Sequence, residues 1–502
     1  MRSRFMVGAI LIALQVFLLL KFFHNMPLSI RALIFMGNVV VVFIMLDKDE
    51  SPSFKIPWLL VCIFLPSVGC LFYLFCGRSG AFRKRKSLHD AAREKTRPLF
   101  GTEDEKNRKE IDQPLMQSES YYISAQAGKP LWKHTDVSHF TSGEAAFDTI
   151  IEDLEKARHY IFMEFFILDE GRVLERVLDV LGKKVAEGVE VRMMYDDLGC
   201  ILKIPDSYKK KMTDMGIKVC VFNPFVPVMT VMHNFRDHRK IIVIDGHTGY
   251  TGGINLADEY MNYISPCGYW KDSVERLHGE AVQSLTMLFL ETWHMYAGEM
   301  LKDDLSVYEA HYYHPEPFQG EGFVQPYGYS PLGDELVAEN VYLNLLNHAE
   351  RYCYIATPYL LANYELIAAI KLAARRGVDV RIFLPRETDA WYVQIVTRGY
   401  YSSLIESGVR VYEYTPGFIH EKAFIIDDTT AVTGTVNLDY RSLKHHFECG
   451  VWMYKTKAVK EIYEDFQTIQ KDSRLLTQAD ARNIPWYEEL LRRILQLAGP
   501  LM

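Results

Sequence analysis

Two histidine–lysine pairs in this 502-residue chain carry the side chains needed for chemistry at a phosphate. His238 and Lys240 form the first pair, and His420 and Lys422 form the second, 182 positions later. A neutral imidazole can attack phosphorus, and a protonated one can give its proton to the leaving oxygen. Ammonium groups can hold the non-bridging oxygens and offset the charge that develops there. The two pairs together suffice for displacement at a phosphodiester, and this chemistry requires no metal or other cofactor.

Both pairs belong to a longer repeat with the same internal spacing. A single histidine among the 16 in the chain would carry little weight, but a chance repeat would not keep four spacings. We expect Asn255 and Asn437, with the small residues before them, to supply further hydrogen-bond donors near the phosphate. The matching positions downstream of the two pairs are Asp245 with Asp427, Gly253 with Thr435, and Asn255 with Asn437.

Each pair opens a run of β-branched and aromatic residues, which predicts a buried strand. Side chains two residues apart on a strand share a face, so each histidine lies beside its lysine. Asp245 and Asp427 follow these strands and are catalytic candidates, with orientation of the site as their alternative role. Glu448 is expected to hydrogen-bond a histidine and fix its tautomer.

The paired H-x-K-x4-D-x6-G-[GT]-x-N motifs resemble those of the phospholipase D superfamily, and the surrounding sequence is similar to bacterial cardiolipin synthases. His446 departs from the family pattern, which usually has Asn before its Phe-Glu. The resemblance implies two phospholipase D-type halves about a pseudo-two-fold axis, with His238 as nucleophile and His420 as acid and base. The stretches that carry it are Asn234–Lys240, Thr251–Asn255, Thr357–Tyr359 and Gly434–Ser442.

The activity that the resemblance implies is a membrane-bound phosphatidyl transfer. Phosphatidylglycerol would be both donor and acceptor, a phosphatidyl-histidine would be the intermediate, and the products would be cardiolipin and glycerol. A phospholipase that uses water as acceptor is the alternative, because the same groups would serve it. A membrane-tethered nuclease and a non-catalytic scaffold rank lower. The net charge of −8 argues against a nucleic-acid partner, and both motifs are intact.

The order of elements predicts an α/β fold built twice, with a largely parallel sheet in each half. In the first half, the expected strands before the motif are 160–166, 188–195 and 216–222. Their counterparts in the second half are 349–355, 377–381 and 408–414. We therefore divide the catalytic part into halves at 131–315 and 316–502.

Residues 1–77 are expected to hold membrane segments at about 5–23, 31–46 and 57–76. The second is short for a bilayer, so two or three crossings stay open. Residues 78–130 are expected to be a basic juxtamembrane stretch followed by a linker. The cluster Arg83–Lys86 favours a cytoplasmic position for this stretch and attraction to anionic lipids. The expected location is the bacterial cytoplasmic membrane, multi-pass, with the catalytic part on the cytoplasmic side.

Overall fold

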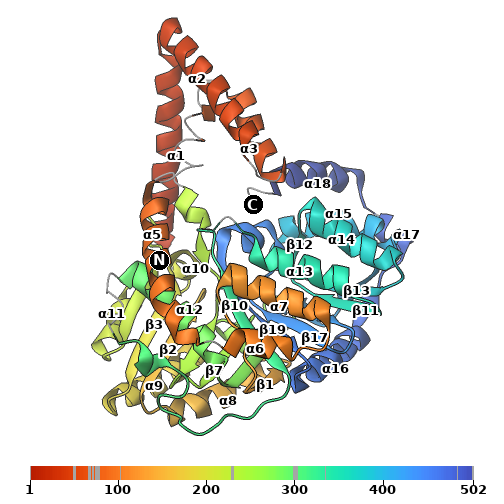
Figure 1. Ribbon diagram of the computed structural model, residues 1–502. Coiled ribbons are helices and arrows are strands. Elements are labelled where there is room, and N and C mark those ends of the chain that lie inside the picture. Colours follow the sequence, from red (N-terminus) through yellow and green to blue (C-terminus); the bar gives the residue numbers. More distant parts are fainter. Residues whose placement is uncertain are drawn as a thin grey trace.

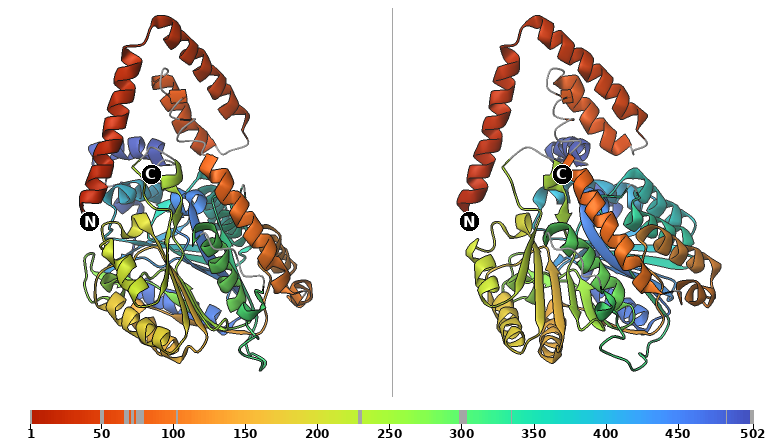
Figure 2. Two further views of the ribbon diagram at one scale, coloured as in Figure 1. Left: turned by 90° about the vertical axis from the view of Figure 1, so that its left-hand side faces the viewer. Right: turned by 60° about the vertical axis from the view of Figure 1, so that its left-hand side comes forward.

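The computed structural model describes residues 2–48, 52–65, 69–70, 73, 80–101, 103–227, 231–297, 304–333, 335–482 and 484–499. Two β-sheets and the helices that flank them form the main body, and three N-terminal helices project from one side of it (Figures 1 and 2). These three helices are α1 (Arg2–His24), α2 (Leu28–Asp47) and α3 (Pro52–Phe64).

The two sheets repeat one strand order. Within the described ranges the first has seven strands, β1 (Thr135–Phe140), β9 (Val274–Gly279), β7 (Thr248–Gly252), β6 (Ile241–Ile244), β2 (Tyr160–Phe165), β3 (Glu190–Asp196) and β4 (Lys218–Phe222). The second follows the same path with β10 (Phe323–Tyr329), β19 (His446–Tyr454), β17 (Thr430–Gly434), β16 (Ala423–Ile426), β11 (Tyr352–Ala356), β13 (Asp379–Pro385) and β14 (Arg410–Tyr414), and β20 (Ser473–Leu475) adds to its edge. The expected duplication is confirmed.

The expectation of largely parallel sheets is wrong. Among the described strands, β2, β3 and β4 run parallel to one another in the first sheet, and β11, β13 and β14 do so in the second. The other neighbours along the two strand paths are antiparallel. The motif strand β6 is antiparallel to both β2 and β7. The physical reason is that helical crossovers link the parallel strands, whereas a tight turn joins β6 to β7 and reverses the chain.

Helices and sheets alternate in five layers. Successive strand residues point to opposite faces, so Ile161 packs toward the outer helices while Phe162 packs toward the middle of the molecule. The first sheet's outer layer is α8 (Gly143–Lys156), α9 (Arg172–Ala186) and α11 (Ser207–Asp214), and the second sheet's is α13 (Val337–His348), α14 (Tyr364–Arg375) and α15 (Trp391–Ile405). Between the sheets lie α12 (Val282–Ala297) and α16 (Lys457–Lys471), whose apolar residues share one core with both sheets.

Two short strands cross between the halves and repeat the symmetry. β5 (Arg236–Asp237), just before the first motif, pairs with the start of β19 in the second half. β15 (Gly417–Ile419), just before the second motif, pairs with β8 (Tyr269–Lys271) in the first half. Each motif is therefore attached by backbone hydrogen bonds to the opposite half.

The N-terminal segments agree only partly with expectation. Among the described residues, α2 is the one helix long and apolar enough to cross a membrane, at 20 residues. It is longer than the expected 31–46 segment and matches the roughly 20 residues that a bilayer requires. The third expected segment, 57–76, is described only through residue 65 and at 69, 70 and 73, so the rest of that prediction lies outside the described residues.

The expected linker is folded. It contains η1 (Arg97–Phe100), α6 (Glu103–Lys109) and α7 (Pro114–Ala127), and the basic juxtamembrane stretch before it forms α5 (Gly80–Thr96). Met116, Ile123 and Ala127 of α7 are buried in the core of the second half. This apolar stripe was missed because glutamines and serines separate its members. Arg85 of α5 lies over the Tyr296 ring at 4.1 Å and donates to the Met295 carbonyl, which holds α5 on α12.

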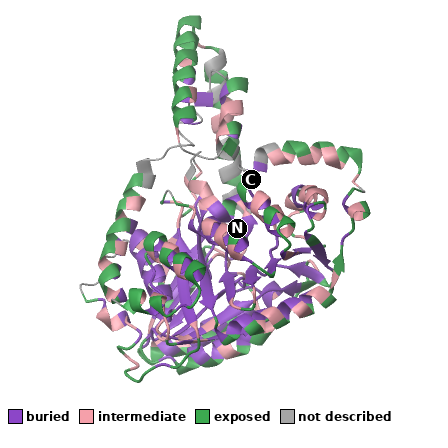
Figure 3. Ribbon diagram, turned by 45° about the vertical axis from the view of Figure 1, so that its right-hand side comes forward, coloured by how far each residue is buried: buried purple, intermediate pink, exposed green. Residues whose placement is uncertain are grey.

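The remaining described elements are short or lie at the C-terminal end. They are α10 (Asp197–Cys200), η2 (Val231–Asn234), η3 (Asp258–Met261), η4 (Ser306–Tyr308), β12 (Leu360–Leu361), β18 (Leu438–Asp439), η5 (Arg441–His445), α17 (Gln478–Arg482) and α18 (Trp486–Ala498). The strands are largely buried, whereas α18 presents exposed and half-buried residues (Figure 3).

Candidate active site

The crossing strands place the two candidate histidines at the junction of the halves. The His238 amide donates to the Phe447 carbonyl at 2.9 Å, and the His420 amide donates to the Lys271 carbonyl at 2.7 Å. Both histidines and their lysines lie just before strands β6 and β16 rather than within them. All four side chains are buried, with the His238 and His420 side chains 9% and 8% exposed.

Each imidazole is held by a carboxylate from the opposite half. His238 Nδ1 lies 2.9 and 3.0 Å from the two oxygens of Glu448, as the sequence predicted for this glutamate. His420 Nδ1 lies 2.6 Å from Asp272 Oδ2. A carboxylate that accepts from Nδ1–H fixes the tautomer in which Nε2 carries the lone pair. Both rings are therefore oriented to use Nε2 as nucleophile or base.

Asp272 is a functional candidate that the sequence reasoning missed. Pairing of Gly252 with Val274 and of Gly434 with Gly450 makes Asp272 the structural counterpart of Glu448. The 182-residue shift that relates the two motifs does not carry Asp272 onto Glu448, because the spacing after the motifs differs between the halves. Alignment of the two halves from Gly252 and Gly434 onward would have revealed it.

The four catalytic candidates share one electrostatic environment. Burial, Lys240, Lys422 and His420 all lower the pKa of His238 well below its usual value. Burial and Lys422 lower the pKa of His420 to about 4, against the opposing effect of Asp272. Both imidazoles are therefore neutral at pH 7 when no anion is bound.

Burial also shifts the protonation of the two lysines. Burial lowers the pKa of Lys240 to about 8 and that of Lys422 to about 7, although nearby carboxylates oppose the shift. Each ammonium donates to the backbone carbonyl of the histidine in its own motif. An anion bound between them would restore their full protonation, because an opposite charge favours the charged form. The arrangement is suited to a phosphodiester.

Gly253 and Thr435 support the carboxylates instead of supplying backbone donors to a substrate. Their amides donate to the Ser273 and Cys449 carbonyls, each at 3.0 Å. The Thr435 hydroxyl donates to Glu448. At the equivalent Gly253, a Cβ would lie 1.8 Å from an Asp272 oxygen, so only glycine leaves room for the aspartate.

Asp245 and Asp427 do not join the site. They lie at the far ends of β6 and β16, with φ of 50° and 53°. The Asp245 carboxylate accepts from the amides of Arg158, His159 and Tyr160 at 2.8, 2.8 and 2.9 Å. Asp427 accepts in the same way from residues 350–352. These hydrogen bonds tie each motif strand to its neighbour, which agrees with the orienting role given as the alternative for these two residues.

The two asparagines differ in their bonding. Asn255 is fully engaged, since Oδ1 accepts from the Ile167 amide at 3.0 Å and Nδ2 donates to the Tyr260 hydroxyl at 2.6 Å. The Tyr260 ring lies 5.7 Å from that of His420, so Asn255 contacts a side chain that packs beside the second motif histidine. Asn437 is buried, and within the described part of the chain its Oδ1 makes no hydrogen bond.

Comparison with known proteins assigns both halves to one kind of domain. Residues 150–293 and 342–470 match the family model described as "Cardiolipin synthase, PLD-like domain", and residues 33–78 match a phospholipase D-nuclease N-terminal domain. A cardiolipin synthase from a Geobacillus species is 32% identical over 94% of each chain. An uncharacterized protein from Streptococcus mutans is 39% identical over 89% of this chain and 96% of its own length.

Among solved structures, the phosphatidylserine synthase of Haemophilus influenzae has a similar fold. It superposes with a TM-score of 0.57 and 14% sequence identity, over 76% of this chain and 98% of that one. At this identity the similarity supports the fold alone.

Proposed function

Because the chain belongs to the cardiolipin synthase family, whose chemistry is phosphatidyl transfer between phospholipids, we propose that it converts two phosphatidylglycerol molecules into cardiolipin and glycerol. The observation that supports this most strongly is the crossed pairing of His238 with Glu448 and of His420 with Asp272. It brings an imidazole and a lysine from each half to one junction, where Lys240, Lys422 and His420 all act electrostatically on His238. Two phospholipid substrates also suit a chain with an apolar helix of membrane-spanning length.

In the first step, His238 Nε2 attacks the phosphorus of one phosphatidylglycerol. The phosphorus–oxygen bond to the terminal glycerol breaks, and the leaving oxygen takes a proton from His420. The products are a phosphatidyl-histidine and free glycerol. His420 must be protonated for this step, and the negative phosphate raises its pKa from the low value of the empty site.

In the second step, a hydroxyl of another phosphatidylglycerol enters. His420, now neutral, removes the proton from this hydroxyl as its oxygen attacks the phosphorus. The phosphorus–nitrogen bond breaks and returns His238 to its neutral state. Lys240 and Lys422 hold the non-bridging oxygens throughout, and loss of either is expected to cost about 2–4 kcal/mol of transition-state stabilisation.

We assign the site to the cytoplasmic side of a multi-pass bacterial cytoplasmic membrane protein, with N-terminal segments in residues 1–77 and halves at 131–315 and 316–502. The exposed Arg83 and Lys84 at the start of α5 support this sidedness, because basic residues favour the cytoplasmic flank of a membrane helix. The helix α2 supplies the hydrophobic length.

The C-terminal helix α18 supports contact between the main body and the lipid surface. Leu495 packs against α15 and Arg492 donates to the Gly399 carbonyl at 3.0 Å, so one side of α18 is attached to the protein. The helix lies at the end of the main body nearest the N-terminal helices (Figures 1 and 2), and its other side exposes apolar residues. Its exposed residues are Trp486, Tyr487, Leu490 and Ile494. An aromatic and aliphatic face of this kind suits the membrane interface.

The deciding experiment is product analysis of the purified chain with labelled phosphatidylglycerol alone, in a buffer that contains a metal chelator. We expect cardiolipin and glycerol in equal amounts. Phosphatidic acid as the main product would instead establish hydrolysis, with water as acceptor. His238→Gln and His420→Gln should each abolish product, whereas the exposed control His311→Gln should retain it.

A further inference from the structure

His446 is a third imidazole beside the proposed nucleophile. It is the first residue of β19, is 8% exposed, and its ring centroid lies 5.4 Å from that of His238. Within the part of the chain that the structure describes, neither of its ring nitrogens makes a hydrogen bond. Its nearest charged neighbour, Glu448 Oε1, lies 3.5 Å from Nδ1, which is long for a hydrogen bond, so this buried imidazole calls for an explanation. The proposed chemistry gives it no role.

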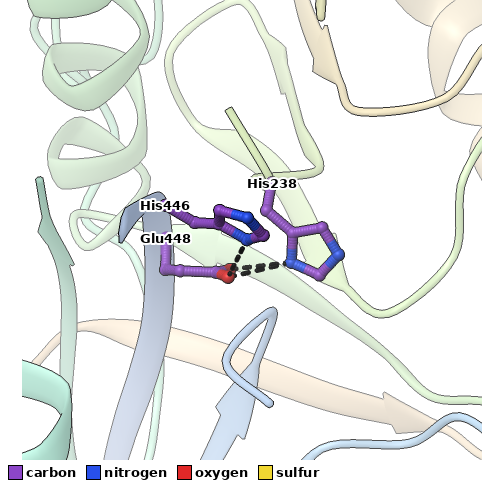
Figure 4. A group of neighbouring side chains, drawn as sticks. All are labelled: His238, His446 and Glu448. Atoms are coloured by element: carbon purple, nitrogen blue, oxygen red, sulfur yellow. Dashed lines mark hydrogen bonds and ion pairs between the residues drawn. The ribbon is translucent and has the colours of Figure 1, made fainter. Parts of the chain in front are cut away.

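Glu448 lies between the two rings (Figure 4). Its Oε1 is 2.9 Å from His238 Nδ1 and 3.5 Å from His446 Nδ1. One ligand atom from each of the three residues lies within 4.8 Å of the others, and all three residues are buried. Two ligands of a tetrahedral ion with bonds of about 2.0–2.1 Å are separated by about 3.3 Å. Small side-chain movements would therefore bring the three atoms to bonding distance of one ion.

The residue types are those of known transition-metal sites. Two imidazoles and one carboxylate form a ligand set that binds zinc with a fourth position open. Imidazole favours zinc and the neighbouring transition ions over magnesium or calcium. The Nδ1 atoms of both buried rings face the same Glu448 carboxylate, which places the three ligand types around one point.

We propose that His238, His446 and Glu448 form an inhibitory site for a divalent transition-metal ion such as Zn²⁺. The ion takes the lone pair of His238 Nδ1, and the single proton of this neutral ring moves from Nδ1 to Nε2. Nε2 then has no lone pair with which to attack phosphorus. No proton is lost from His238 and no electron is transferred, so binding is a simple, reversible coordination.

The same geometry predicts that the ion is easily removed. Lys240 and Lys422 both act electrostatically on His238, and their positive charge opposes a second cation nearby. A chelator should therefore restore activity. The inhibitory consequence rests on the proposed function, but metal binding itself does not require that function to be correct.

The first test measures binding without turnover, on chelator-treated full-length protein titrated with Co²⁺. We expect the visible absorption of coordinated cobalt to saturate at one ion per chain. His446→Asn and His238→Gln should each lose this signal. His420→Gln is the matched control, because it removes the other motif histidine, which is not among the three ligands, and it should keep the signal.

The second test measures cardiolipin formation with added Zn²⁺. The parent protein should be inhibited and then recover with chelator, whereas His446→Asn should be active without metal and at least about tenfold less sensitive to Zn²⁺. If His446→Asn fails to fold, His446→Gln takes its place. The proposal is overturned if the parent binds no cobalt, if the His446 variant binds it as the parent does, or if His420→Gln loses it equally. Cobalt binding by a chain that makes no cardiolipin would refute the proposed function and leave the metal site standing.

Discussion

The carboxylate of Asp272 offers the sharpest test of the crossed pairing, through the substitution Asp272→Asn. This aspartate is fully buried, and its Oδ2 lies 2.6 Å from His420 Nδ1. A hydrogen bond to a charged group contributes about 1.5–3 kcal/mol, which corresponds to roughly tenfold to hundredfold in rate. An amide can also present its NH₂ to Nδ1 and so select the wrong tautomer, which costs about 10⁴-fold in a catalytic triad. We therefore expect a loss of about 10²- to 10⁴-fold in kcat/KM.

The assay should separate the roles of the two histidines. Asp272 holds the proposed acid, whereas Glu448 holds the proposed nucleophile. A phosphatidyl ester with a p-nitrophenol leaving group needs no acid for its departure. With this ester, the Asp272→Asn variant should release a burst of nitrophenolate close in size to that of the parent protein. The Glu448→Gln variant should release no burst. The assigned pairing would be refuted if Asp272→Asn made cardiolipin at the parental rate. It would also be refuted if Glu448→Gln, and not Asp272→Asn, released the nitrophenolate burst.

Four further outcomes follow from the geometry. Asp245→Ala removes the acceptor of three backbone amides, so the free energy of unfolding should fall by about 2–4 kcal/mol in chemical denaturation, while kcat per folded molecule changes little. Gly253→Ala should inactivate the enzyme because its Cβ would displace Asp272. The control Gly333→Ala, whose Cβ meets nothing nearer than 3.8 Å, should keep its activity. Equal activity of the two variants would count against the role of Gly253 in making room for Asp272. The pH profile of kcat/KM should decline as pH rises through about 7, because Lys422 loses its charge above its lowered pKa, and Lys422→Arg should move this decline upward; an unmoved decline would implicate another group. The fluorescence of Trp486 can be obtained by subtracting the emission of Trp486→Phe from that of the parent protein. Lipids brominated on their acyl chains should quench it, and unquenched emission would contradict a position of α18 at the membrane interface.

The sequence predicted the duplication and the paired catalytic groups because side-chain type and spacing encode them directly. Strand direction was less accessible, since β2 and β6 are similar apolar runs and neither shows in its sequence that the two pair antiparallel. The tight turn after Asp245 accounts only for the reversal between β6 and β7. The role of Asp245 was left open because a turn aspartate and a catalytic one have the same local sequence. Asp272 was missed because it acts on a histidine 148 residues away, across the interface of the halves.

The unexpected helix α7 has a related cause. Its buried residues face the second half, so their apolar spacing has meaning only when that partner is present. The crossing pairs β5 with β19 and β15 with β8 are also non-local. Short strands of two or three residues carry almost no sequence signal of their own. The geometry that joins each histidine to the opposite carboxylate is therefore the part that only the folded chain reveals.

The most direct test of one shared phosphate site is to trap the covalent intermediate. His420→Gln would be mixed with the p-nitrophenyl ester carrying a labelled phosphatidyl group, quenched in alkali and digested, and the labelled peptide identified by mass spectrometry. We predict label on the peptide that contains His238, and none when Lys240 or Glu448 is also replaced. If only the His238→Gln variant were labelled, on His420, the roles of the two histidines would be reversed. If neither variant formed a phosphohistidine, the proposed covalent mechanism would be contradicted.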